Sequence, residues 1–148
     1  MLVNVDDLIT ALLSRDGEIE WYLDLNSGQT VPLLSEHDDP DRSLAEALES
    51  QPERFLTIAP IGSDGALAIM GAFAASLPPG KPQGRLTGAL CQPRPFRHFK
   101  NALLKWPHIR KQWHRFHKAR THAIADAWLT AYSLQARLTE PKATRAEA

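Results

Sequence analysis

The chain has 148 residues, of which 17 are Lys or Arg, 17 are Asp or Glu, and one is cysteine. A chain of this length buries about two-thirds of its unfolded surface, so it needs no disulfide or metal to fold. The lone Cys91 excludes an internal disulfide and is typical of a reducing compartment. Asp6 and Asp7 stand where a secretory leader would be apolar, and the apolar run over residues 66–77 is too short to span a bilayer. We therefore expect a cytoplasmic protein with no membrane partner.

The net charge of zero hides a separation of charge along the chain. Residues 1–80 hold 14 acids and three bases, whereas residues 81–148 hold 14 Lys and Arg and three acids. Such asymmetry indicates a polyanionic partner. The alternative is that the two halves fold against each other and neutralise their charges.

The N-terminal residues predict a helix followed by a β-hairpin. Asn4 is a favourable N-cap for a helix whose first turn carries Asp7. Apolar and polar side chains alternate over residues 18–25, as in a half-buried strand, and residues 29–34 predict its partner. Pro32 lacks the N–H that a strand ladder uses, so we expect the second strand to lie at an edge of the sheet or to carry a bulge there.

The middle of the chain predicts a third strand between helices. A short helix begins near Ser43, and residues 54–59 form the third strand. Residues 65–77 are apolar almost all round a helix, which predicts a buried helix. Residues 84–91 predict a weaker helix, because it contains two internal glycines.

The C-terminal part predicts a pair of helices that meet at Pro107. This proline either kinks one helix or begins the next, since it has no N–H to donate. We expect Phe96 and Phe99 to contact Trp113 and Phe116 across this break. The second helix should run from about residue 107 to about residue 136. Its expected buried stripe consists of Ile109, Trp113, Phe116, Ala123, Ile124, Ala127, Trp128 and Ala131.

Together these elements predict the α+β fold class, with a small antiparallel sheet packed against helices and ending in a C-terminal helical pair. We expect a single α+β domain over residues 1–138. Residues 139–148 are small, polar and interrupted by proline, so they predict a disordered tail.

Several fragments, in their order and spacing, resemble those of a known family. The hairpin segment Tyr22-Leu-Asp-Leu-Asn-Ser-Gly28 and the strand Phe55-Leu-Thr-Ile-Ala-Pro60 come first, and Phe96-Arg-His-Phe-Lys100 and Trp113-x-x-Phe116 follow. Over roughly residues 3–132 the chain resembles the uncharacterised protein family (UPF) 0158 of bacteria. That resemblance implies no catalytic residues, because the family has no assigned function. The chain departs from the family pattern at His114, where an aromatic residue often follows the tryptophan, and in the lack of acids over residues 108–122.

The strongest functional signal is the basic helix over residues 108–122, which holds five Lys or Arg, four His and no acid. Its charged side chains should project away from the apolar stripe and attract phosphates. The preceding helix adds further cations. The candidate polyanion-binding residues are Arg110, Lys111, His114, Arg115, Lys118, His122, Arg97 and Lys100.

Arg120 differs from these cations because it falls on the expected apolar stripe, seven residues after Trp113. A buried guanidinium would need a carboxylate partner. The alternative is that its long stem carries the charge out to water.

Other chemistries have little support in the sequence. His114-x-x-His117 places two imidazoles on one helix, but a zinc site needs a third or fourth ligand. The acidic segment over residues 36–41 lacks the ligand spacing and central glycine of a calcium loop. No Gly-x-Ser-x-Gly nucleophile motif is present. We therefore expect no metal, no cofactor and no catalytic residue.

The best interpretation is a small non-enzymatic binding or regulatory protein that uses its basic C-terminal helical face. Nucleic acid is the leading partner, although the sequence contains no helix-turn-helix, zinc-finger or aromatic RNA-binding motif. An acidic protein partner, self-association or a plain solvated surface would also explain the charges. The rival classes are an enzyme with a dispersed polar site and a structural, self-associating protein.

Overall fold

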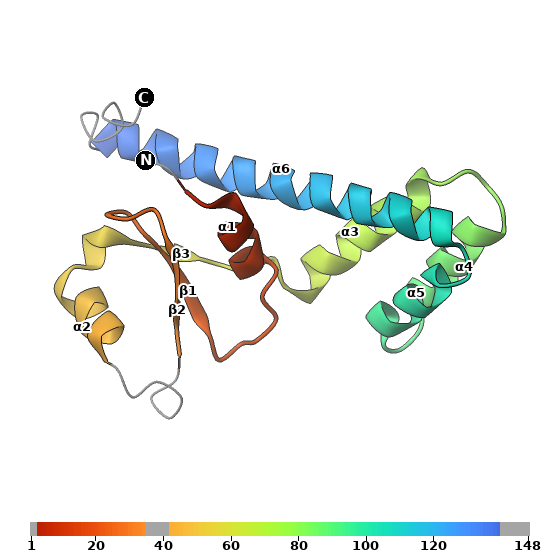
Figure 1. Ribbon diagram of the computed structural model, residues 1–148, viewed down its shortest axis with the longest axis horizontal. Helices are drawn as coiled ribbons and strands as arrows, with labels where there is room; N and C mark the ends of the chain where they lie inside the picture. The colour runs from red at the N-terminus through yellow and green to blue at the C-terminus, as the bar shows by residue number, and fades with distance from the viewer. Residues whose placement is uncertain (1–2, 35–41, 140–148) are drawn as a thin grey trace. The chain divides into compact units, whose positions relative to one another are not determined.

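A computed structural model describes residues 3–34 and 42–139, with side chains as far as Tyr132. The chain forms an α+β fold, as predicted, with one three-stranded antiparallel sheet (Figure 1). It divides into two compact units. The sheet unit comprises Met1–Pro60 and Ile124–Ala148, and the helical unit comprises Ile61–Ala123. The single domain expected over residues 1–138 stays a prediction, and residues 140–148 of the expected tail lie outside the described residues.

The sheet unit begins with helix α1 (Val5–Leu12). The side chain of Asn4 accepts a hydrogen bond of 3.1 Å from the backbone N–H of Asp7. This bond satisfies one of the free N–H groups of the first turn, and Asp7 places a negative charge at the positive end of the helix. The predicted N-cap is therefore confirmed.

The sheet consists of β1 (Glu20–Asp24), β2 (Thr30–Leu33) and β3 (Phe55–Ile58) in the order β2-β1-β3. Both pairings are antiparallel, and Trp21 of β1 faces Pro32 on one side and Ile58 on the other. Pro32 therefore lies on an edge strand, as its missing N–H requires. Each strand is shorter at both ends than the alternation of apolar residues predicts.

The third strand is preceded by α2 (Ser43–Ser50) and a single 3-10 turn, η1 (Pro52–Arg54). The core of the sheet unit joins α1 to the sheet and to the second part of the long C-terminal helix, α6 (Pro107–Thr139). Leu8 of α1, Leu23 of β1 and Ile58 of β3 are each at most 1% exposed. Ala125 of α6 is fully buried among them.

The helical unit contains α3 (Gly62–Ser76), α4 (Lys81–Leu90), α5 (Pro95–Leu103) and α6 as far as Ala123. The break before Pro107 is confirmed, because α5 ends at Leu103 and Pro107 begins α6. Helix α3 begins three residues earlier than predicted. The predicted burial of α3 is confirmed for Ile69, Met70, Phe73 and Ala74, which are its buried residues.

The buried stripe of α6 differs from the prediction in its second part. Ala123, Ala127 and Ala131 are exposed, whereas Thr121 and Ala125 are buried. A repeat counted in sevens drifts by about 20° per repeat on a straight α-helix. Successive residues are about 100° apart, so this drift accounts for only part of the change. Ala125 packs in the core formed with α1 and the sheet, so the second part of α6 is buried by other neighbours than the first. Alanine is also too small to mark the buried face by its hydrophobicity.

Candidate polyanion-binding surface

The helical unit carries almost none of the acids of the chain. Only Asp64, of the 17 Asp and Glu, falls within residues 61–123, whereas 11 of the 17 Lys and Arg and five of the six histidines do. The structural division therefore separates the acids more completely than the division of the sequence into halves, which leaves three acids in residues 81–148. One carboxylate cannot neutralise 11 cations, so this unit has a strongly positive field of its own.

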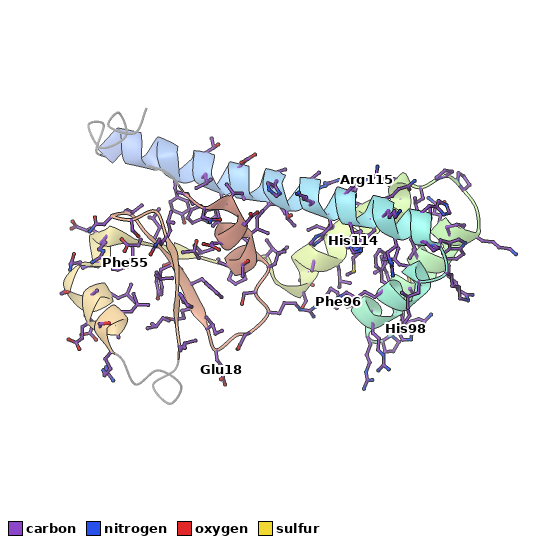
Figure 2. The ribbon with its side chains drawn as sticks, viewed as in Figure 1. Glu18, Phe55, Phe96, His98, His114 and Arg115 are labelled. Carbon is purple, nitrogen blue, oxygen red and sulfur yellow. The ribbon has the colours of Figure 1, made fainter. Side chains whose placement is uncertain are left out.

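The predicted cations of α6 form an exposed band on this unit. Arg110, Lys111, His114, Arg115 and Lys118 are all exposed, and Figure 2 labels His114 and Arg115 on this helix. Residues three or four apart on a helix are neighbours, with about 5–6 Å between Cβ atoms. These five residues are connected by such spacings, so their charges lie side by side. We call them the α6 band.

None of the four Lys and Arg of the α6 band is paired with a carboxylate of residues 3–34 or 42–139. Like charges at these spacings repel each other by a few tenths of a kcal/mol per pair. An anion that bound to the band would relieve this repulsion. The arrangement therefore favours ligands that carry several negative charges in a row.

His122 lies at the C-terminal end of the band and is half-buried. Its Nδ1 lies 2.9 Å from the carbonyl oxygen of Lys118, and a carbonyl oxygen only accepts, so Nδ1 carries the hydrogen. Arg115, Lys118, Ala119 and His122 line a shallow hollow of about 290 Å³. The structure thus places three of the predicted site residues around one depression.

The two predicted residues of α5, Arg97 and Lys100, are also exposed. Lys100 lies near His117 of α6, where its charge helps to lower the pKa of that imidazole. Burial of His117 is the larger cause of the lowered pKa, and the neighbouring His114 is the second. The ring of His117 lies 5.1 Å from the ring of Trp113, so this histidine belongs to the core side of α6 rather than to the band.

Of the two alternatives for Arg120, the structure shows the second, in which the long stem carries the charge out to water. Its side chain is exposed, and its guanidinium lies 4.9 Å from the ring centre of Phe116 in a cation–π contact. Within the part of the chain that the structure describes, it has no carboxylate partner. Thr121 occupies the buried position instead, and its hydroxyl lies 2.9 Å from the carbonyl oxygen of His117.

A second group of cations lies between α4 and α5 and was not singled out as a site from the sequence. Lys81 and Arg85 of α4 and Lys105, which follows α5, line a common hollow. The glycines of α4 make its periodicity weak, so no sequence pattern places these three side chains together. Lys105 is far from Lys81 and Arg85 in the sequence, so only the folded structure shows that the three form a cluster.

Chemical groups for metal binding do not gather in the described residues. No cluster of three or more His, Cys, Asp or Glu side chains occurs there, and Cys91 is exposed. The acidic segment over residues 36–41 lies outside the residues that the structure describes. Among those it does describe, no helix is both long enough and apolar enough to cross a membrane.

The fold and this surface define a class of protein: a small α+β protein whose helical unit presents an exposed cationic band. The chain belongs to the uncharacterised protein family UPF0158, whose profile matches residues 1–143, so the resemblance seen in the sequence is confirmed. It is 32% identical over 135 residues to a UPF0158 protein of Pseudomonas aeruginosa, and the match covers 91% of this chain and 86% of that relative. No solved structure matches the chain with significance.

Proposed function

We propose that this protein is a non-enzymatic binding or regulatory protein that binds polyanions through the α6 band, with nucleic acid as the principal ligand. The observation that supports it is the charge of the helical unit, with 11 Lys and Arg against one acid. The Lys and Arg side chains of the α6 band are exposed, and none has a carboxylate partner among the described residues. A phosphate backbone bound there releases its condensed counterions, which drives association without any shaped pocket.

The chemistry of the band favours contacts to phosphates over contacts to bases. Its members are exposed side chains on one helix and, within the described residues, none is held in place by an ion pair. Phosphate contacts position a protein on nucleic acid but carry no sequence information directly. We therefore expect little preference for nucleotide sequence.

The test is fluorescence anisotropy with labelled duplex and single-stranded oligonucleotides at low and moderate salt. The variant K111E/R115E reverses two adjacent charges of the band. The control R15E/R42E changes the net charge by the same amount in the sheet unit. Circular dichroism of all three proteins verifies that they are folded.

We expect the wild type and the control to bind alike, and the band variant to bind about tenfold more weakly or worse. Equal binding by the wild type and the band variant would contradict the proposal. So would the absence of wild-type binding at low salt.

A further inference from the structure

A second cationic site lies in the helical unit, apart from the α6 band. Lys81, Gly84, Arg85, Lys105 and Trp106 line a hollow of about 560 Å³. This volume lies within the range of about 300–1,000 Å³ that is typical of small-molecule sites. The hollow shares no residue with the α6 band, so an inference drawn from it does not depend on the proposed function.

Three cations face this hollow and no acid lines it. Within residues 3–34 and 42–139, neither Lys81, Arg85 nor Lys105 forms an ion pair with a carboxylate. Arg and Lys are the side chains that bind phosphate, Arg through two parallel N–H donors and Lys as a point charge. The charge of the lining therefore fits a ligand with two or more negative charges.

The fourth side chain of the hollow is an aromatic ring without a described ring partner. Trp113 packs on Phe73 and Phe99, and Trp128 packs on Tyr132. Trp106, in contrast, pairs with no aromatic ring in the described part of the chain, and it is half-buried beside Lys105 and Arg85. Such an indole beside cations offers a stacking surface for a planar group.

A smaller hollow of about 190 Å³ adjoins the first, since Arg85 and Lys105 line both. Its polar lining includes the amides of Gln92 and Asn101 and the imidazole of His98, which Figure 2 labels on α5. Amides and an imidazole both donate and accept hydrogen bonds, which suits the hydroxyls and heteroatoms of a ligand. We call these two adjoining hollows along α4 and α5 together the groove.

We infer that this groove binds a nucleotide, with Lys81, Arg85 and Lys105 on the phosphates and the base against the indole of Trp106. A phosphate group alone would use the cations and leave the aromatic surface unused. A planar base alone would leave three cations without a counter-charge. A ligand that joins the two matches both features of the lining.

Gly84 makes the groove testable without harm to the fold. It is an interior residue of α4, and a Cβ built on it meets no atom within 4 Å, so a side chain there would extend into open space of the hollow. The variant G84L should therefore block the groove. Gly88 of the same helix is equally open but lines neither hollow, so G88L is the matched control. Both changes replace a helical glycine, which favours the helix.

The experiment is isothermal titration calorimetry of the full chain with ATP, adenosine and inorganic triphosphate. We expect ATP to bind at least about tenfold more tightly than either adenosine or triphosphate, because each of these retains only part of the contacts. G84L should lose ATP binding, and G88L and K111E/R115E should keep it. Retention by K111E/R115E separates this site from the α6 band.

Triphosphate binding as tight as that of ATP would overturn the inference, as would ATP binding that G84L leaves unchanged or no ATP binding at all. The terminal nucleotide of a nucleic-acid strand offers the same phosphate and base as a free nucleotide. A short single-stranded oligonucleotide with a 5′-phosphate therefore serves as a competitor. If the phosphorylated oligonucleotide displaces ATP from G88L and the unphosphorylated one does not, the natural ligand of the groove is the phosphorylated end of a nucleic-acid strand.

Discussion

The ring of Trp113 lies edge-on to the ring of Phe99, with their centroids 5.0 Å apart, and joins α6 to α5 across the break at Pro107. The same indole packs on Phe73 of α3, with centroids 5.4 Å apart. Trp113 therefore connects three helices of the helical unit, and its burial sets which face of α6 points outward. The predicted contacts of Trp113 with Phe99 and Phe116 are confirmed, and the expected contact of Phe96 with these rings stays a prediction.

Removal of this ring should destabilise the protein strongly. We expect W113A to lower the free energy of unfolding by about 3–5 kcal/mol, because a large cavity would remain among three helices. Urea unfolding followed by circular dichroism measures the change. Trp106 is half-buried and has no ring partner among the described residues, so W106A should cost less. A loss under about 1 kcal/mol for W113A would refute the central role of Trp113.

Two glycines of α3 should respond in opposite directions to the same substitution. Gly71 lies inside the helix, and an added Cβ there meets no atom within 4 Å, so G71A should stabilise the protein by about 0.5–1 kcal/mol. Gly62 begins the helix with φ of 74°, where an L-residue is strained, so G62A should destabilise it by about 1–2 kcal/mol. Thermal melts of the two variants check the pair, and shifts of the same sign would contradict this account of α3.

Local signals in the sequence predicted most of the fold. The N-cap Asn4, the alternation over residues 18–25 and the two roles of Pro107 each depend on neighbours in the chain, so they can be read without the tertiary structure. The sequence could not decide between the two alternatives for Arg120, because only the packing shows that Thr121 is buried and that Arg120 lies on Phe116.

Only the part of the candidate site that depends on neighbours in the chain was predicted from the sequence. The α6 band is continuous in sequence, so its exposure follows from the apolar stripe opposite to it. The groove between α4 and α5 combines Lys81 and Arg85 with Lys105, and only the packing of the two helices brings them together. The segregation of acids also became sharper once the structure divided the chain at residues 61 and 123.

The ion pair between Asp24 and Arg54 predicts a loss of stability in acid. Nη2 of Arg54 donates to Oδ2 of Asp24 at 2.8 Å, and Nε donates to Oδ1 at 3.0 Å. The side chain of Asp24 is only 8% exposed, and the hydrogen bonds from Arg54 are the main cause of its lowered pKa. A carboxyl whose pKa is lowered by folding stabilises the protein above its unfolded pKa of about 3.9, and this contribution is lost as the pH falls through the folded value.

The variant R54M isolates that contribution. We expect it to be much less stable than the wild type at pH 6, with the difference shrinking as the pH falls below about 3.9 and Asp24 becomes protonated. Urea unfolding of both proteins between about pH 2 and pH 7 measures the difference. A difference that is constant over this range would show that the ion pair contributes nothing that depends on the charge of Asp24.

His117 should add a separate loss of stability at mildly acidic pH. Its pKa is lowered by burial and by the charges of His114 on α6 and Lys100 on α5. As the pH falls through about 6.5, the unfolded chain takes up a proton more readily than the folded one, so stability declines until the folded histidine is also protonated. H117N should flatten the unfolding free energy between about pH 5 and pH 7 relative to the wild type. An unchanged slope in the variant would assign that dependence to other groups.

The salt dependence of nucleic-acid binding should count the phosphates that the α6 band contacts. Each duplex phosphate neutralised adds about 0.9 to the slope of log K against log salt concentration. K111E/R115E removes two cations that lie one helical turn apart, so its slope should be shallower than that of the wild type by about 2. R15E/R42E alters the net charge equally but leaves the band intact, and its slope should match the wild type. An equal reduction of the slope in both variants would mean that overall charge, and not this helix face, determines binding.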